Sequence, residues 1–154
     1  GYRWHDTKGI KPLYAFGHGL SYTNFKITNV KTDRQRYSPT DTLAISCVVK
    51  NTGTRDGSEV VQIYIGKPDS KVKRAVKELK GFEKVAVRRG ASKTVCINIP
   101  ASTLAFYDES LAEWNLERGT YVLFVGNASD NISKEIKIVV EGFLWIERYV
   151  VFRN

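Results

Sequence analysis

Apolar and polar residues alternate at every second position over much of this chain, whereas helical periodicity is almost absent. The clearest case is the run in which Leu43, Ile45, Cys47 and Val49 alternate with more polar neighbours. Successive side chains of a strand point to opposite faces of a sheet, so this run predicts a strand with one buried face. The same pattern predicts seven strands, at residues 25–32, 42–51, 58–66, 78–87, 92–100, 120–126 and 133–141.

Turn-forming sequences separate most of these runs, among them SPTD at 38–41, NTGTRDG at 51–57 and RRGAS at 88–92. Short strands punctuated in this way are typical of an antiparallel, immunoglobulin-like β-sandwich, and we therefore predict an all-β fold of about seven strands. Alternation then assigns the inward positions of the remaining strands: Val61, Ile63, Ile65, Val95, Ile97, Ile99, Ile136, Ile138 and Val140.

Two aromatic residues stand near the most apolar strand, YVLFVG. Tyr121 opens that strand, where sandwich domains place a tyrosine corner whose hydroxyl bonds to upstream backbone, so we predict a structural role for it. Trp114 lies on the approach to the strand. It either caps the sandwich or provides a platform on which a sugar ring stacks.

The two cysteines are predicted to be free thiols. Cys47 shares the parity of the inward residues of its strand, whereas Cys96 lies between Val95 and Ile97 and should point outward. Side chains on opposite faces of a sheet cannot meet the geometry of a disulfide.

The net charge of +8 is concentrated in one segment, because residues 67–93 hold ten Lys or Arg and only three acidic residues. Such a segment can attract an acidic partner, anionic lipid or nucleic acid. Lysines also protect the edge strands of a sheet from pairing with other chains. We favour a solvated, lysine-guarded edge and expect no nucleic-acid partner, since no nucleic-acid-binding motif accompanies the charge.

The two ends of the chain do not follow the sandwich pattern. Residues 1–24 are rich in aromatic residues and glycine, and residues 143–154, FLWIERYVVFRN, follow Gly142. An exposed segment with so many large apolar side chains would be prone to aggregate, so we expect this tail to dock on the domain or on a partner. The start at Gly1 and the lack of methionine are expected of a processed product or a piece of a longer protein, with neither a membrane span nor an intact signal peptide.

The N-terminal segment contains PLYAFGHGLSYTNF at residues 12–25, which suggests a pocket, a metal site or a joint between domains. His5 and His18 are the two histidines of the chain, and no further ligands stand at a spacing suited to a metal. We therefore predict no metal and no cofactor. Gly17 and Gly19 are expected to let the chain turn tightly, and the surrounding rings to wedge that turn.

Groups suited to catalysis are scarce. Asp108, Glu109 and Glu113 are sequence neighbours in YDESLAEW, whereas a glycosidase needs two carboxyl groups held about 5–10 Å apart across a sugar. We interpret this stretch as a solvated loop. The chain has no nucleophile elbow, no cysteine near a histidine in sequence and no phosphate-binding glycine loop. A complete active site within these residues is not expected.

Several long motifs, in order, resemble glycoside hydrolase family 3 enzymes. They are GYRWHDTKGIKPLYAFGHGLSYTNF at 1–25, VKNTGTRDGSEVVQIYI at 49–65, VKELKGFEKV at 76–85, GASKTVCINIP at 90–100 and LAFYDESLAEWNLERGTYVLFVGNAS at 104–129. The match covers about residues 1–141. It implies a C-terminal fibronectin type III-like domain at 25–141, preceded by a linker, residues 1–24, from a missing α/β domain.

The resemblance implies a parent enzyme of the retaining β-glucosidase type. In that family the nucleophile and the acid/base residue come from the other two domains, and the one Ser-Asp pair here, Ser129-Asp130, is followed by Asn131 rather than tryptophan. The chain alone is therefore expected to be a non-catalytic accessory domain that braces the catalytic domains and their active-site rim loops. Alternatives are a carbohydrate-binding module, with Trp4, Trp114 or Trp145 as stacking rings, or one subunit of a split or proteolysed β-glucosidase.

The expected partner is the catalytic region of such an enzyme, in the same chain or another. In some members of the family this domain supports contacts between subunits, so assembly into a homo-oligomer is an alternative that the resemblance leaves open. No membrane partner is expected. The sequence does not specify a compartment. Candidates for the interdomain contact or the substrate rim lie in the linker: Tyr2, Trp4, Tyr14, Phe16, His18 and Tyr22. Alternatively, these rings cap the open end of the sandwich itself.

Overall fold

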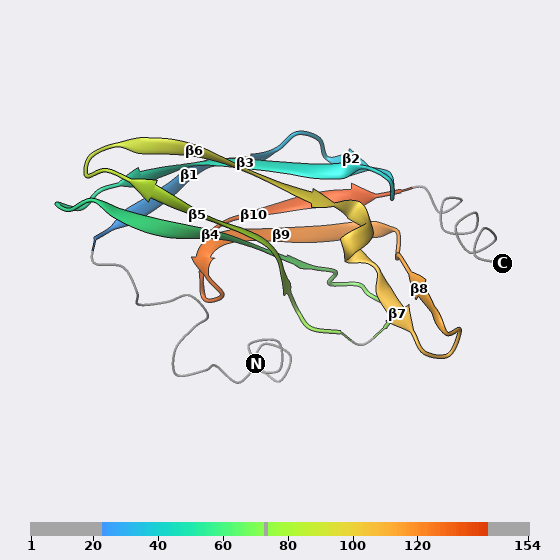
Figure 1. The fold of residues 1–154 in the computed structure, drawn as a ribbon. Coiled ribbons are helices and arrows are strands. Elements are labelled where there is room, and N and C mark those ends of the chain that lie inside the picture. The colour runs from blue at the N-terminus through green and yellow to red at the C-terminus, as the bar shows by residue number, and fades with distance from the viewer. Residues whose placement is uncertain (1–22, 73, 142–154) are drawn as a thin grey trace.

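The computed structural model describes residues 23–72 and 74–141, which form ten strands and one short 3-10 helix (Figure 1). The elements in chain order are β1 (Phe25–Thr32), β2 (Arg36–Tyr37), β3 (Thr42–Asn51), β4 (Gly57–Gly66), β5 (Glu78–Val87), β6 (Ser92–Pro100), η1 (Ala101–Leu104), β7 (Phe106–Asp108), β8 (Glu113–Asn115), β9 (Gly119–Ala128) and β10 (Asn131–Val140).

The strands build two layers and a small hairpin. One sheet has the order β1-β3-β6, the other the order β2-β10-β9-β4-β5, and β7 pairs with β8 alone. The pairings are antiparallel except for that of β2 with β10. The predicted all-β sandwich is confirmed, and each of the seven predicted strands is present. β2, β7 and β8 are additional short strands that alternation did not reveal.

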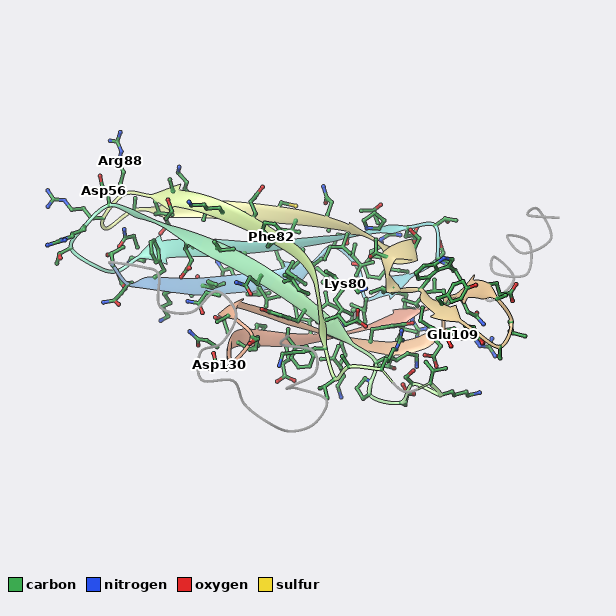
Figure 2. All side chains as sticks on the ribbon, turned by 60° about the horizontal axis from the view of Figure 1, so that its bottom comes forward. Asp56, Lys80, Phe82, Arg88, Glu109 and Asp130 are labelled. Atoms are coloured by element: carbon green, nitrogen blue, oxygen red, sulfur yellow. The ribbon has the colours of Figure 1, made fainter. Side chains whose placement is uncertain are left out.

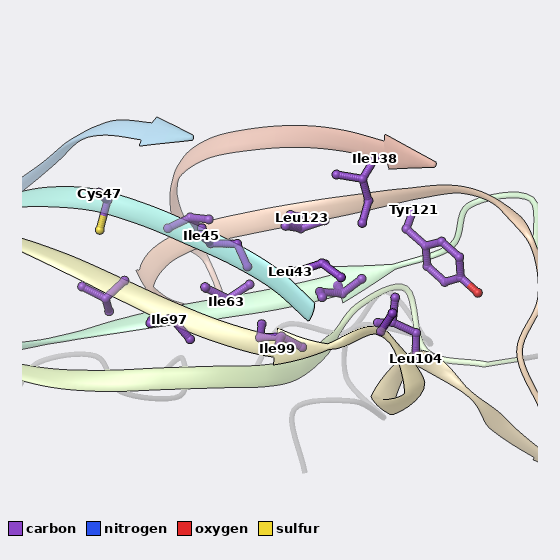
Figure 3. Packing of buried hydrophobic residues seen from close by; sticks show 14 of the residues in the cluster. Leu43, Ile45, Cys47, Ile63, Ile97, Ile99, Leu104, Tyr121, Leu123 and Ile138 are labelled. Atoms are coloured by element: carbon purple, nitrogen blue, oxygen red, sulfur yellow. The ribbon is translucent and has the colours of Figure 1, made fainter. Parts of the chain in front are cut away.

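The core lies between the two sheets, where the inward positions of the alternating strands meet (Figure 3). On β3 and β6, Leu43 pairs with Ile99 and Ile45 with Ile97, so these side chains share one face. Burying each such aliphatic side chain stabilises the fold by about 1.5–3 kcal/mol relative to leaving it in water. The predicted core residues are buried in this cluster, with Ile136 partly buried at its margin.

The cysteines lie on opposite sides of the three-stranded sheet. Cys47 is buried in the core, Cys96 is exposed, and both are free, which confirms the prediction of two free thiols. Burial raises the pKa of the Cys47 thiol to about 11, because an apolar environment disfavours the thiolate. Within the described residues, no helix is long and apolar enough to cross a lipid bilayer.

The β7–β8 hairpin extends beyond the end of both sheets, next to η1 (Figure 1). Proline at position 100 ends β6, and the following 3-10 turn buries Ala101 and Leu104 against the core. This turn redirects the chain out of the sandwich and so positions the hairpin. We call this end of the molecule the hairpin end, and the end with the β3–β4 and β5–β6 connections the Asn51 end.

Candidate functional site

Tyr121 anchors the hairpin end from inside the core. Its side chain is buried, and its hydroxyl donates a hydrogen bond of 2.5 Å to the carbonyl oxygen of Glu117, four residues upstream. Burial raises the pKa of Tyr121 to about 12, although Arg74 acts in the opposite direction. The hydroxyl therefore stays protonated and able to donate near neutral pH. This geometry is that of a tyrosine corner.

The carboxylate of Glu117 joins two segments that are far apart in the sequence. It accepts a hydrogen bond of 2.9 Å from the backbone N–H of Lys71 and another from the hydroxyl of Ser70. The Nη2 atom of Arg74 lies 3.2 Å from its Oε1 atom. Hydrogen bonds to a charged group are stronger than those between neutral groups. The β4–β5 connection is thus fastened to the segment that leads into β9.

Arg74 occupies the centre of this end. Its Nη1 atom donates to the carbonyl oxygen of Leu104 over 3.4 Å, and its guanidinium lies 5.4 Å from the ring centroid of Phe106 and 5.8 Å from that of Tyr121. The Nη2 atom is buried and forms an ion-pair contact with Glu117, and it has no hydrogen-bond partner within the described part of the chain. Arg74 is therefore a structural cation between a strand and the hairpin.

Lys67 is a second buried cation. Its side chain is 3% exposed, its Nζ atom donates over 2.7 Å to Asp69, and the same atom lies 5.5 Å from the centroid of the Tyr121 ring. The interpretation of residues 67–93 as a solvated edge is therefore wrong for Lys67 and Arg74. It does describe a set of exposed cations further along: Lys84, Arg88, Arg89 and Lys93. Sequence alone does not separate the two groups, because both consist of basic residues beside turns.

The stretch interpreted as a solvated loop forms the β7–β8 hairpin instead. Asp108 ends β7, and its Oδ1 atom accepts hydrogen bonds from the N–H and hydroxyl of Ser110 and from the N–H of Leu111. The hydrogen bond from the Ser110 side chain is the main cause that lowers the pKa of Asp108 below its usual value. A general acid needs a raised pKa, so Asp108 serves to close the turn.

The outward side of the hairpin carries two aromatic rings. Tyr107 pairs directly with Trp114 across the two strands, their ring centroids are 5.6 Å apart, and the rings are inclined by 74°. Trp114 is 56% exposed and Tyr107 48% exposed, so Trp114 does not cap the sandwich. At this inclination the two rings form a corner rather than one flat platform.

The opposite end is closed by Asn51, which sequence reasoning treated as part of a turn. Its amide donates to the carbonyl oxygens of Arg55, at 2.8 Å, and Val87, at 2.9 Å. Its oxygen accepts from the Thr23 hydroxyl and the Gly53 N–H, each at 3.0 Å. The side chain is fully buried. All four hydrogen-bonding positions of the amide are therefore used inside the protein.

Several residues singled out in the sequence lie outside the described residues. They are Tyr2, Trp4, Tyr14, Phe16, Gly17, His18, Gly19, Tyr22 and Trp145. Within residues 23–72 and 74–141, no group of three or more His, Cys, Asp or Glu side chains is arranged to hold a metal ion.

Comparison with known proteins gives a consistent result. Residues 59–129 match the family of the fibronectin type III-like domain. The chain is 42% identical over 132 residues to thermostable beta-glucosidase B of Acetivibrio thermocellus, covering 86% of this chain and 18% of that protein. It is 43% identical over 143 residues to a beta-glucosidase of Kluyveromyces marxianus, covering 90% of this chain and 16% of that protein.

Solved structures extend the likeness to the fold. DesR, a beta-glucosidase from Streptomyces venezuelae solved in complex with D-glucose, matches with a TM-score of 0.82 and 37% identity, over 92% of this chain and 18% of that chain. A GH3 beta-glucosidase from Bifidobacterium adolescentis matches with a TM-score of 0.83 and 32% identity, over 91% of this chain and 20% of that chain. The chain thus spans about a fifth of the length of these relatives.

Proposed function

The chain carries a fibronectin type III-like domain of the kind found in family 3 β-glucosidases, and from this premise we propose that it acts as a non-catalytic accessory domain of such an enzyme. The observation that carries the proposal is the coverage: the match to DesR takes in 92% of this chain but only 18% of the relative. Most of the length of that relative therefore has no counterpart among the residues of this chain.

The described residues support the non-catalytic half of the proposal. Asp108, which belongs to the most promising acidic cluster, has a lowered pKa and accepts hydrogen bonds that close a turn. Glu117 is tied to Arg74, Ser70 and Lys71. A pair of carboxyl groups for glycoside hydrolysis needs one member that holds a proton at working pH, and the lowered pKa of Asp108 favours its ionised form instead.

The proposed role is to brace the catalytic domains and the loops at the rim of their active site. Catalysis depends on loops held within a fraction of an ångström, so a remote domain can alter the rate without touching substrate. Two large apolar side chains on and just before the edge strand β5 are exposed: Phe82 at 67%, labelled in Figure 2, and Val76 at 58%. We assign them, with the aromatic residues of the linker, to the contact with the catalytic domains.

The test combines this chain with a fragment of a family 3 β-glucosidase that lacks its own fibronectin type III-like domain. An aryl β-glucoside is supplied to the chain alone, to the fragment alone and to the mixture. We expect no hydrolysis by the chain alone, and a higher melting temperature and kcat/KM for the fragment in the mixture. The Phe82→Asp variant should lose this effect, whereas Thr94→Asp, at an exposed position of the other sheet, should keep it.

Two results would contradict the proposal in different ways. Hydrolysis by the isolated chain would exclude a non-catalytic domain. A fragment whose stability and activity do not change when the chain is added, although both proteins are folded, would exclude the bracing role.

A further inference from the structure

A pocket at the hairpin end has no part in the accessory role proposed above. It has a volume of about 550 Å³ and lies between β7–β8, η1 and the start of β5, where Glu78, Lys80, Ser102, Phe106, Tyr107 and Trp114 contribute to its wall. Small-molecule sites usually have volumes of roughly 300–1,000 Å³. We propose that this pocket binds a pyranose ring of a neutral oligosaccharide, with Trp114 and Tyr107 as the stacking corner.

The aromatic wall carries the first part of the argument. Trp114 and Tyr107 are among the five large apolar side chains that the described part of the chain leaves exposed. Their cross-strand pairing fixes them 5.6 Å apart at an inclination of 74°. A pyranose with equatorial hydroxyl groups presents axial C–H groups on its faces, which pack against an aromatic ring. Because the two rings meet at an angle, the sugar can stack its face on one ring while the other ring contacts the edge of the sugar.

The polar wall carries the second part. The Nζ atom of Lys80 donates over 2.9 Å to the carbonyl oxygen of Thr103 and lies 3.5 Å from Oε2 of Glu78. A lysine ammonium has three N–H donors, so a further donor remains for a ligand hydroxyl. The exposed hydroxyl of Ser102 lines the same pocket. Donors next to an aromatic face suit a ligand that has apolar faces and a hydroxylated rim.

The balance of charge indicates that the ligand is neutral. Lys80 is paired with Glu78, and the other cation of the wall, Arg74, is paired with Glu117. Bringing a charged ligand into such a site would disturb pairs that are already largely removed from water, at a cost in desolvation. A neutral sugar can add hydrogen bonds without breaking them.

The same features separate this pocket from a surface for another protein. The centre of a protein interface is apolar and depleted of charged residues, whereas this pocket has an ion pair in its wall. The apolar tip of the hairpin, Leu111, is 58% exposed and does not line the pocket. The floor is also held in place, since the Arg74 guanidinium lies over Phe106 and donates to Leu104. A rigid support of this kind favours binding of a small ligand.

The test titrates the folded 154-residue chain with cellohexaose by isothermal calorimetry, with an oligomer of hexuronic acid of the same length as the charged comparator. We expect saturable binding of cellohexaose and weaker binding of the acidic oligomer. Trp114→Ala and Tyr107→Ala should each weaken binding about tenfold, because roughly 1.4 kcal/mol of lost aromatic contact corresponds to that factor. Trp114→Phe should retain most of the affinity.

Leu111→Ala is the matched control, since it removes an exposed apolar side chain from the same hairpin outside the pocket. Its affinity for cellohexaose should equal that of the unaltered chain. Three results would overturn the proposal: no binding of cellohexaose, equal binding by Trp114→Ala, or tighter binding of the acidic oligomer. A Trp114→Ala chain that binds no less sugar but no longer associates with the catalytic fragment would assign the hairpin to a protein interface instead.

Discussion

The two ends of the sandwich are closed by different chemistry. At the Asn51 end, marked by Asp56 and Arg88 in Figure 2, one neutral amide makes four hydrogen bonds and is fully buried. At the hairpin end, marked by Glu109, closure depends on the cations Lys67 and Arg74, on Glu117 and on the Tyr121 hydroxyl. The hairpin end also presents the exposed aromatic corner.

This difference bears on which end has groups available to a small ligand. A buried amide with every donor and acceptor used leaves no group available to a ligand. The charged network at the hairpin end instead supports a projecting hairpin whose aromatic rings and polar groups face solvent. The Asn51 end is closed by the hydrogen bonds of a neutral amide, whereas the hairpin end combines charged closing contacts with an exposed aromatic surface. The following changes test that contrast in order of expected effect.

Asn51→Ala should have the largest effect on stability. The change removes the amide that satisfies the buried Val87 carbonyl and the Gly53 N–H. Leaving buried polar groups without partners should lower the free energy of unfolding by about 3 kcal/mol. Denaturant unfolding measures the loss, with Asn98→Ala, at an exposed position of β6, as the control. A loss no greater than that of the control would show that Asn51 does not hold its end together.

Gly66→Ala should be the next most damaging change. A Cβ atom at this position would lie 2.0 Å from the carbonyl oxygen of Val76, which is backbone and cannot simply move away. Overpacking of this kind costs about 2 kcal/mol. Gly90→Ala, at the Asn51 end, meets nothing within 4 Å and is strained only by its φ of +74°, which costs about 1 kcal/mol. Thermal unfolding should show a lower melting temperature for Gly66→Ala than for Gly90→Ala. The reverse order would contradict the close approach of the Gly66 backbone to the Val76 carbonyl oxygen.

Tyr121→Phe should cost about 1 kcal/mol, since it removes the hydrogen bond to the Glu117 carbonyl but keeps the buried ring. The control is Tyr107→Phe, which alters an exposed hydroxyl on the hairpin. Chemical denaturation of both variants measures their free energies of unfolding. The comparison separates the effect of the tyrosine corner at Tyr121 from a general effect of losing a hydroxyl. Equal stability of the two would show that the tyrosine corner does not stabilise this end.

Asp33→Asn should give the smallest effect, and it should depend on pH. Asp33 accepts hydrogen bonds from the Tyr37 hydroxyl, at 2.6 Å, and the Ala44 N–H, at 3.1 Å, and the bond from Tyr37 is the main cause that lowers its pKa. A lowered pKa gives stability that is present above the unfolded pKa of about 3.9 and is lost as pH falls through the folded pKa.

The difference in unfolding free energy between the unaltered chain and Asp33→Asn should therefore shrink between about pH 6 and about pH 3. The deficit of Asn51→Ala should be the same at both, because an amide does not titrate in this range. Unfolding curves at the two pH values check both statements. A pH-independent deficit for Asp33→Asn would show that the ionised carboxylate of Asp33 does not stabilise the fold.

Local pattern was enough to predict the body of the sandwich. The alternation of Leu43, Ile45, Cys47 and Val49 predicts both the strand and its buried face, because a strand with one side in water must repeat every two residues. The same reasoning separated Cys47 from Cys96, and β1, β3, β5 and β6 have the bounds that the sequence predicts. These features depend on residues that are neighbours along the chain.

The features that distinguish the two ends depend on residues far apart in the sequence. Asn51 bonds to Val87, 36 positions away, and Ser70 bonds to Glu117, 47 positions away. The neighbours of a residue along the chain do not show which distant residue it will contact. For this reason the local sequence predicted a turn residue at Asn51 and a solvated cation at Arg74. The aromatic corner likewise needed the three-residue strands β7 and β8 to bring Tyr107 and Trp114 together.

The sequence by itself therefore determined the seven longer strands, their buried faces and the free thiols, since the two-residue period of a strand is a local property of the backbone. The tertiary structure alone decided which polar residues are buried, which cations are paired and where the exposed rings meet. The reason is physical: burial and pairing are set by what the folded chain brings within hydrogen-bonding distance, and alternation carries no information about those partners.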